Sequence, residues 1–166
     1  MVSGMLLSCK ASSSSLGLAP GTFTALMDLY ERNYILMRRL APELPPGGQG
    51  RVSRVVDGLD LHLRVLERHR YTSDLVLTYH FQRLQGPGRE PNLSIRIYHD
   101  ARVAEVLAAQ LRHWPEFPDP PSDDLGAARQ SMSRLYTRWR VNRFLYKWLG
   151  YCLYQGHRFD GRCAQS

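Results

Sequence analysis

A histidine lies beside a carboxyl group near the end of a predicted strand. His99 and Asp100 are adjacent, and Glu105 follows a few positions later. A histidine next to carboxylates can act as a general base or hold a metal ion. Neighbouring residues of a strand point to opposite faces, however, and Asp100 is equally suited to cap the next element. We therefore predict a ligand pocket without assigning catalytic residues. Its candidate members are Arg70, Tyr98, His99, Asp100 and Glu105.

A basic stripe on a predicted C-terminal helix is the second candidate site. With about 100° between successive residues, the basic side chains fall on one narrow line, and apolar side chains cover most of the remaining circumference. Basic groups beside aromatic rings can hold phosphates and stack on bases. The solvated side of a core helix has the same composition, so both interpretations stay open. The candidate anion-binding residues are Arg140, Arg143, Lys147 and Tyr154.

The polar face of a predicted sheet is a third candidate. Polar residues alternate there with buried ones, and in a meander they would be neighbours across strands. An anion or a single strand of nucleic acid would fit on such a surface, but an ordinary solvated sheet face shows the same alternation. The residues concerned are His62, Arg64, Thr78, His80, Arg96 and Tyr98.

Metal and cofactor motifs are not recognised in the sequence. Cys152, His157 and Cys163 do not have the spacing of a structural zinc site and lack a fourth ligand. The sequence has no glycine-rich phosphate loop, no nucleophile elbow and no CxxC pair. Cys152 sits in an aromatic helix and is interpreted as a small core residue. We predict no metal and no cofactor, and favour a non-enzymatic role.

The net charge of +7 is distributed unevenly along the 166 residues. Basic and acidic residues balance over residues 1–124, so residues 125–166 carry the whole excess. This asymmetry indicates an anionic partner, which could be nucleic acid, a nucleotide or an acidic protein. No apolar run approaches the ~20 residues of a membrane span, and three irregularly spaced cysteines favour a reducing compartment. We expect a cytoplasmic protein without a membrane partner, and predict no oligomeric state.

Two helices and several strands must position these side chains. Apolar residues at spacings of three and four predict a helix from Thr22 or Thr24 to about Ala41, ended by Pro42. A long helix is expected over residues 135–155, with Gly156 as its C-terminal cap, and a start nearer Asp124 is the alternative.

The middle of the chain has the two-residue period of half-buried strands. Alternation predicts strands at residues 59–65, 75–82 and 93–98, and residues 51–56 are a further strand candidate. Asp57-Gly58 predicts a two-residue hairpin turn. Residues 102–112 fit a helix and a strand almost equally well.

Two helices on one face of an antiparallel sheet would bury all these apolar stripes. We therefore predict an α+β fold, with about four meander strands and the N- and C-terminal helices packed on one face. Residues 1–20 are expected to be a disordered leader, residues 21–157 a single domain, and residues 158–166 a flexible basic tail.

Several short segments between Phe23 and His157 carry a family resemblance. They are Leu29-Tyr30-Glu31-Arg32-Asn33-Tyr34, Arg38-Arg39-Leu40, Arg70-Tyr71-Thr72, Tyr98-His99-Asp100-Ala101, Ala104-Glu105-Val106, Asn142-Arg143-Phe144-Leu145, Trp148-Leu149 and Tyr151-Cys152-Leu153. In these segments the chain resembles the YqiB-like family, small proteobacterial proteins whose function is not established. The resemblance implies a bacterial, soluble, cytoplasmic protein without a cofactor or signal peptide. It supplies no activity and no catalytic residues.

Three functions remain open from the sequence. The first is a non-enzymatic binding or accessory module that engages an anionic partner through the basic C-terminal helix. The second is an enzyme or small-ligand binder with a pocket at the Tyr98-His99-Asp100 strand end. The third is a protein-interaction module that uses the aromatic surface of the C-terminal helix around Trp139, Trp148 and Tyr151.

Overall fold

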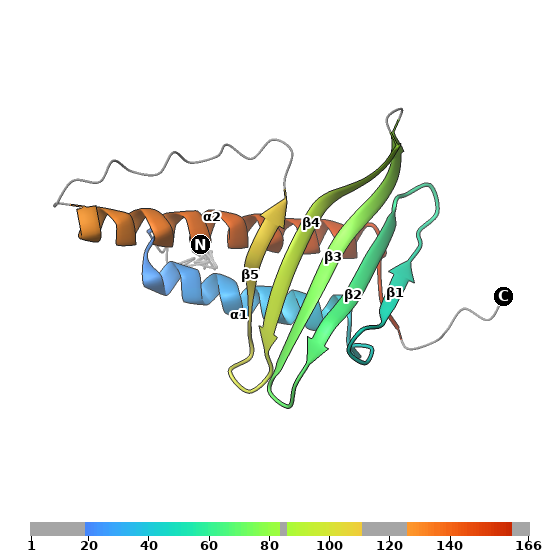
Figure 1. Ribbon diagram of the computed structural model, residues 1–166, viewed down its shortest axis with the longest axis horizontal. Coiled ribbons are helices and arrows are strands. Elements are labelled where there is room, and N and C mark those ends of the chain that lie inside the picture. The colour runs from blue at the N-terminus through green and yellow to red at the C-terminus, as the bar shows by residue number, and fades with distance from the viewer. Residues whose placement is uncertain (1–18, 84–85, 111–125, 161–166) are drawn as a thin grey trace, which may run out of the picture.

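The structure is a computed structural model that describes residues 19–83, 86–110 and 126–160. The predicted leader lies outside these residues except for positions 19 and 20, and the predicted tail is described only to residue 160. The elements follow one another along the chain as α1 (Phe23–Leu40), β1 (Gly50–Ser53), β2 (Asp60–Arg68), β3 (Thr72–Arg83), β4 (Gly86–Tyr98), β5 (Val103–Gln110) and α2 (Gly126–Tyr154) (Figure 1).

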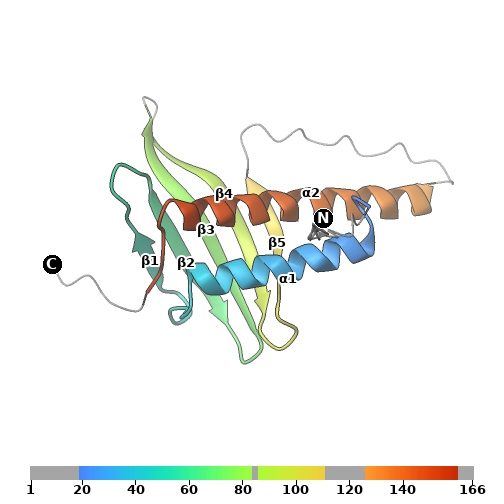
Figure 2. The same ribbon diagram turned by 180° about the vertical axis from the view of Figure 1, so that it is seen from behind.

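The strands form one antiparallel meander in the order β1-β2-β3-β4-β5. Both helices lie on the same face of this sheet and run side by side in the same direction (Figures 1 and 2). The predicted α+β architecture is confirmed, with five strands rather than about four. The fifth is β5, which shows that the ambiguous segment at 102–112 is a strand over residues 103–110.

The helix ends follow the local capping chemistry. Thr22 caps α1, because its hydroxyl accepts a hydrogen bond from the backbone N–H of Ala25 at 3.2 Å. At the end of α2, Gly156 has a φ of 91°, a left-handed conformation that glycine adopts without strain. The backbone N–H groups of Gly156 and His157 then bond back to Leu153 and Cys152. Gly126 begins α2, which is close to the alternative start near Asp124 and earlier than the start near residue 135.

The turn after β1 differs from the prediction. Asp57 adopts a left-handed φ of 57° beside Gly58, as a turn requires, but β1 already ends at Ser53 and β2 begins at Asp60. Residues 54–59 are therefore a loop, and the predicted two-residue hairpin is wrong. Val56 is 92% exposed, so extending the strand would bury no apolar face. The hydroxyl of Ser53 instead accepts the backbone N–H of Arg158 at 3.1 Å, which fixes the strand end.

The inner face of the sheet forms the main core. Leu61, Leu75, Leu77, Leu93 and Ile95 are fully buried there, and each contributes roughly 1.5–3 kcal/mol by leaving water. The helices cover this face with the buried side chains Met37, Leu40, Leu145, Trp148 and Leu149. The alternation read from the sequence matches most of the inward and outward positions. Two exceptions are Leu59, which is exposed before β2, and Thr78, which was expected on the polar face and is buried.

A buried polar junction fixes both helices against the edge strand. The Asn142 side-chain oxygen accepts the backbone N–H of Val106 in β5 at 3.1 Å. The Asn33 amide of α1 donates to the Asn142 side-chain and backbone oxygens, each at 3.3 Å. Both asparagines are fully buried. Because buried amides need partners, this junction specifies one alignment of α1, α2 and β5.

We predict that Asn142→Ala lowers the free energy of unfolding by about 2–4 kcal/mol. The substitution leaves the Val106 N–H buried without a side-chain acceptor, and it removes one of the two acceptors of the Asn33 amide while the backbone carbonyl of residue 142 remains. Urea denaturation followed by circular dichroism measures the change. Tyr154→Ala, at a site 86% exposed on the same helix, is the control and should change stability by less than ~0.5 kcal/mol. Equal stabilities of the two variants would contradict the role given to the junction.

Candidate functional site

A basic pocket of about 560 Å³ opens where two strand turns meet the end of α1. The β2–β3 turn and the β4–β5 turn are joined by a hydrogen bond from the His99 N–H to the Tyr71 carbonyl at 2.8 Å. The last turn of α1 and the segment after it complete the wall. The pocket is lined by Arg38, Pro42, Glu43, Leu44, Arg68, His69, Arg70 and His99.

The three arginines of this pocket are held by uncharged groups. Arg38 donates to the Pro42 carbonyl at 2.7 Å, and Arg68 donates to the Leu44 carbonyl at 2.8 Å. The Arg70 guanidinium lies 5.0 Å from the centre of the Tyr71 ring. Within the described part of the chain, none of the three forms an ion pair with a carboxylate. Their positive charges are therefore oriented without being neutralised by a direct partner.

His99 forms a half-buried wall of the same pocket. One of its ring nitrogens, Nε2, lies 2.9 Å from the hydroxyl of Ser73, which is fully buried. Burial lowers the pKa of His99 below its ordinary value, and repulsion from Arg68 and Arg38 lowers it further, against a small opposing effect of Asp100. The imidazole is therefore neutral near pH 7, and an anion in the pocket would favour its protonation.

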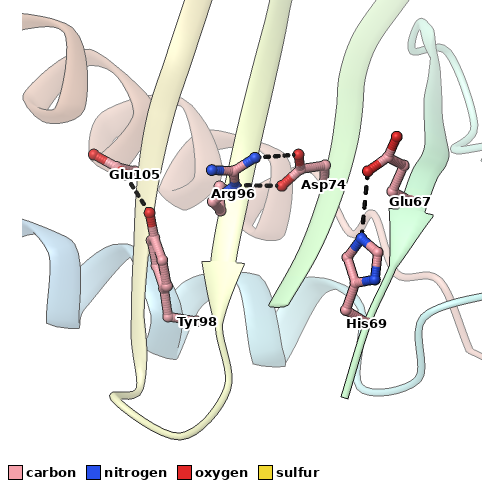
Figure 3. Close-up of polar contacts among 6 residues, drawn as sticks. All are labelled: Glu67, His69, Asp74, Arg96, Tyr98 and Glu105. Carbon is pink, nitrogen blue, oxygen red and sulfur yellow. Dashed lines mark hydrogen bonds and ion pairs between the residues drawn. The ribbon is translucent and has the colours of Figure 1, made fainter. Parts of the chain in front are cut away.

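The structure brings together only some of the residues predicted for a pocket at this strand end. Arg70 and His99 share the pocket, whereas Asp100 is exposed in the following turn. Tyr98 donates its hydroxyl to Glu105 at 2.8 Å along β5, and neither residue lines the pocket (Figure 3). Tyr98 and His99 diverge because adjacent residues of a strand point in opposite directions.

Two of the three pocket arginines, Arg38 and Arg68, were not predicted from the sequence. Arg68 could have been found from the sequence, because the segment Arg68-His69-Arg70 places two arginines around a turn. Arg38 gave no such signal. It lies in the last turn of α1, where a basic side chain is also expected to favour the helix dipole.

Polar residues on the outer face of the sheet are engaged with one another. Arg96 forms a two-pronged ion pair with Asp74, with contacts of 2.7 and 2.6 Å, and this hydrogen bonding lowers the pKa of Asp74 (Figure 3). His62 and His80 stack with ring centres 3.6 Å apart. They line an open hollow of about 880 Å³ together with Arg89, and burial lowers the pKa of both histidines.

The basic stripe on α2 is brought together largely as predicted. Arg140, Arg143 and Lys147 line one shallow groove of about 210 Å³ with Tyr136, Trp139 and Phe144. The Arg143 guanidinium lies 5.2 Å from the centre of the Trp139 ring, and the Tyr136 and Trp139 rings stack at 5.9 Å. The fourth predicted residue, Tyr154, is exposed at the end of the helix and is not part of this groove.

The aromatic surface predicted for protein interaction is mostly internal. Trp148 is buried in the core, and Trp139 is half-buried in the smaller cluster around Leu26 and Tyr30. Tyr151 remains 53% exposed. These three residues therefore do not form one continuous exposed patch.

Cys152 behaves as a core residue. Its thiol is buried 3.3 Å from the Tyr79 hydroxyl, and burial raises the pKa of the thiol to about 11. Cys163 lies outside the described residues. Among residues 19–83, 86–110 and 126–160, no three histidine, cysteine or acidic side chains are grouped to hold a metal ion. In the same part of the chain, neither helix combines the length and hydrophobicity needed to cross a membrane.

Comparisons with known proteins identify relatives but no activity. A family described as "Protein of unknown function (DUF1249)" matches residues 36–158. The chain is 32% identical over 135 residues to "Uncharacterized protein YqiB" of Escherichia coli K12, which covers 81% of this chain and 90% of that protein. The proteins of the same name from Escherichia coli O6:H1 and O157:H7 give the same values. No solved structure matches significantly.

We predict that replacing Arg68 raises the pKa of His99. Arg68 disfavours the protonated imidazole, so Arg68→Gln removes part of that repulsion while burial continues to lower the pKa. An NMR titration of the His99 ring resonances measures the shift. Arg143→Gln on α2 removes the same charge outside this pocket and should leave the His99 pKa unchanged. A pKa of His99 that stays constant or falls in Arg68→Gln would contradict the assignment.

Proposed function

Because the chain belongs to the family described as "Protein of unknown function (DUF1249)", which brings no activity with it, we propose from its own surface that it is a non-enzymatic binding module for single-stranded nucleic acid. The observation that carries the proposal is the groove on α2. It places three cationic side chains, Arg140, Arg143 and Lys147, among aromatic rings on one side of a helix. We call this surface the α2 groove.

The charge of the α2 groove is not balanced within its own helix. Residues 126–154 contain no aspartate or glutamate, so no acidic side chain lies one turn from these cations on α2. Such a helix face attracts a polyanion, and the attraction weakens as salt rises.

The aromatic rings favour nucleic acid over an acidic protein as the polyanion. Tyr136 is 44% exposed at the start of the groove, stacks on Trp139 and has the Arg140 guanidinium 6.0 Å from its ring centre, so aromatic and cationic groups adjoin one another there. Base stacking on aromatic side chains tolerates any sequence and requires unpaired bases. The groove therefore fits a single strand better than a duplex, whose bases are already stacked.

The spacing of the cations fits a short stretch of strand. From Arg140 to Lys147 the helix rises by about 10 Å. Three cations over this length can contact about three phosphates of a strand. A single-strand contact of this size predicts a slope of log affinity against log salt of about −2.

We predict that the triple variant Arg140→Gln, Arg143→Gln, Lys147→Gln loses most binding to a short fluorescent oligothymidine. At low salt the affinity should fall by at least about tenfold, and the salt slope should become shallower by about 2. Fluorescence anisotropy at 50, 100 and 200 mM salt measures both quantities. A variant that binds as well as the wild type would contradict the proposal.

Two further experiments separate binding of oligothymidine at the α2 groove from a general effect of the protein's positive charge. Arg38→Gln, Arg68→Gln and Arg70→Gln together remove the same formal charge outside the groove, and this matched variant should bind oligothymidine almost normally. An equal loss in both triple variants would contradict the α2 groove as the site. Stronger binding of a labelled polyglutamate peptide than of oligothymidine would assign the groove to an acidic protein instead.

A further inference from the structure

We propose that the basic pocket between the end of α1 and the β2–β3 and β4–β5 turns binds the phosphoryl group of a small phosphomonoester, through Arg38, Arg68 and Arg70. This site shares no lining residue with the α2 groove and does not depend on the function proposed for that groove. It adds a small-ligand site to a protein whose other basic surface is an open helix face.

The backbone fixes the positions of the three arginines. Arg38 belongs to the last turn of α1, whereas Arg68 and Arg70 stand on either side of His69 at the β2–β3 turn. That turn is closed by a hydrogen bond from the His69 N–H to the Thr72 carbonyl at 2.8 Å. The His99 N–H then ties the β4–β5 turn to Tyr71, so three separate segments meet at one rigid place.

The side-chain contacts orient the guanidinium groups without using all their donors. A guanidinium has five N–H donors. The contacts described for Arg38 and Arg68 each engage one nitrogen, on the carbonyls of Pro42 and Leu44. Arg70 rests on the Tyr71 ring, a contact that leaves the edge of the guanidinium available for hydrogen bonds. These arginines are therefore held in place for a ligand that accepts several hydrogen bonds.

The charge of the pocket matches a phosphate dianion. Three arginines and one glutamate, Glu43, line the wall, and all four side chains are exposed. Their formal charge of +2 equals the magnitude of the charge that a phosphomonoester carries above its second pKa. Planar guanidinium groups also recognise phosphate through paired hydrogen bonds, so several of them favour phosphate over a single carboxylate.

The size of the pocket indicates more than a bare ion. Its volume of about 560 Å³ lies in the range of ordinary small-molecule sites. The ring of Tyr71, which is 51% exposed, lies beside Arg70, so apolar surface adjoins the cations. A phosphoryl group attached to a small organic body would use both features.

His99 reports occupancy of the site. Its pKa is lowered by burial and by the repulsion of Arg68 and Arg38. The other charged or titratable groups around it are Arg70 and His69 of the β2–β3 turn, Glu43 after α1, and Asp100 in its own turn. A bound dianion would offset the arginines, so the pKa of His99 should rise when the ligand binds.

The test is an NMR titration of the full chain with phenyl phosphate, inorganic phosphate and benzoate as probes. We expect phenyl phosphate to shift backbone resonances of residues 38–44, 68–71 and 99, and to raise the pKa of His99. Binding of inorganic phosphate as strong as that of phenyl phosphate would mean that the phosphoryl group alone is recognised. If inorganic phosphate binds more weakly than phenyl phosphate, the organic group also contributes to binding, and the result supports a phosphomonoester as the ligand. Benzoate binding as strong as that of phenyl phosphate, or no localised shifts, would overturn the proposal.

Arg70→Gln and the double variant Arg68→Gln, Arg70→Gln test the residues themselves. Loss of a charge-assisted hydrogen bond should weaken phenyl phosphate binding by about tenfold or more. Arg70→Gln alone keeps the Arg68 contact to Leu44, so it remains informative if the double variant fails to fold. Arg64→Gln with Arg134→Gln is the matched control, because both arginines are exposed and line neither basic site, and it should bind phenyl phosphate normally. An equal loss in the control and the pocket variants would refute the site while leaving the α2 groove to be judged by its own experiment.

Discussion

Coverage of the β5 edge by the two helices is the constraint on which the rest of the structure depends. An uncovered edge strand exposes backbone groups that pair readily with other chains. Here Asn142 of α2 accepts the Val106 N–H from that edge, and Asn33 of α1 donates to Asn142 in turn. One buried side chain thus satisfies one N–H group of the edge strand and links that strand to both helices. Because an unpaired buried amide is costly, few other alignments of the helices on the sheet would be tolerated.

This alignment decides which surfaces of the helices remain available. With Asn142, Leu145 and Leu149 turned inward, Arg143 and Lys147 necessarily fall on the outer side of α2. The same packing places the C-terminal end of α1 beside the β2–β3 turn. Arg38 of α1 therefore lines the same pocket as Arg68 and Arg70. The α2 groove and the basic pocket are therefore two consequences of one helix arrangement. They differ in form, because the first lies on one helix and the second is a half-open hollow bordered by three segments.

The sequence predicted those features that depend on periodicity within one element. The alternation of Leu61, Leu63 and Val65 and the stripe of Arg140, Arg143 and Lys147 both follow from local geometry, and the structure agrees with that geometry. The pocket depends instead on where α1 ends relative to two distant turns. Neighbours in the sequence were misleading there, because Tyr98 turns toward Glu105 while His99 turns toward Ser73. The Asp57-Gly58 turn was located correctly, but the length of its loop depends on where Ser53 is anchored by the C-terminal segment.

Summing charge over long segments concealed the basic pocket. Residues 1–124 have no net charge, which drew attention to the C-terminal helix. Several carboxylates in that region are engaged elsewhere: Asp28 pairs with Arg32, Asp74 with Arg96, and Glu105 accepts the Tyr98 hydroxyl. A net charge of zero over a long segment therefore does not make every part of its surface neutral. Each of these carboxylates is held by a short contact to its own partner and does not neutralise arginines elsewhere. Arg38, Arg68 and Arg70 are held by carbonyls and a ring rather than by these carboxylates, so a locally positive site arises within a neutral stretch of sequence.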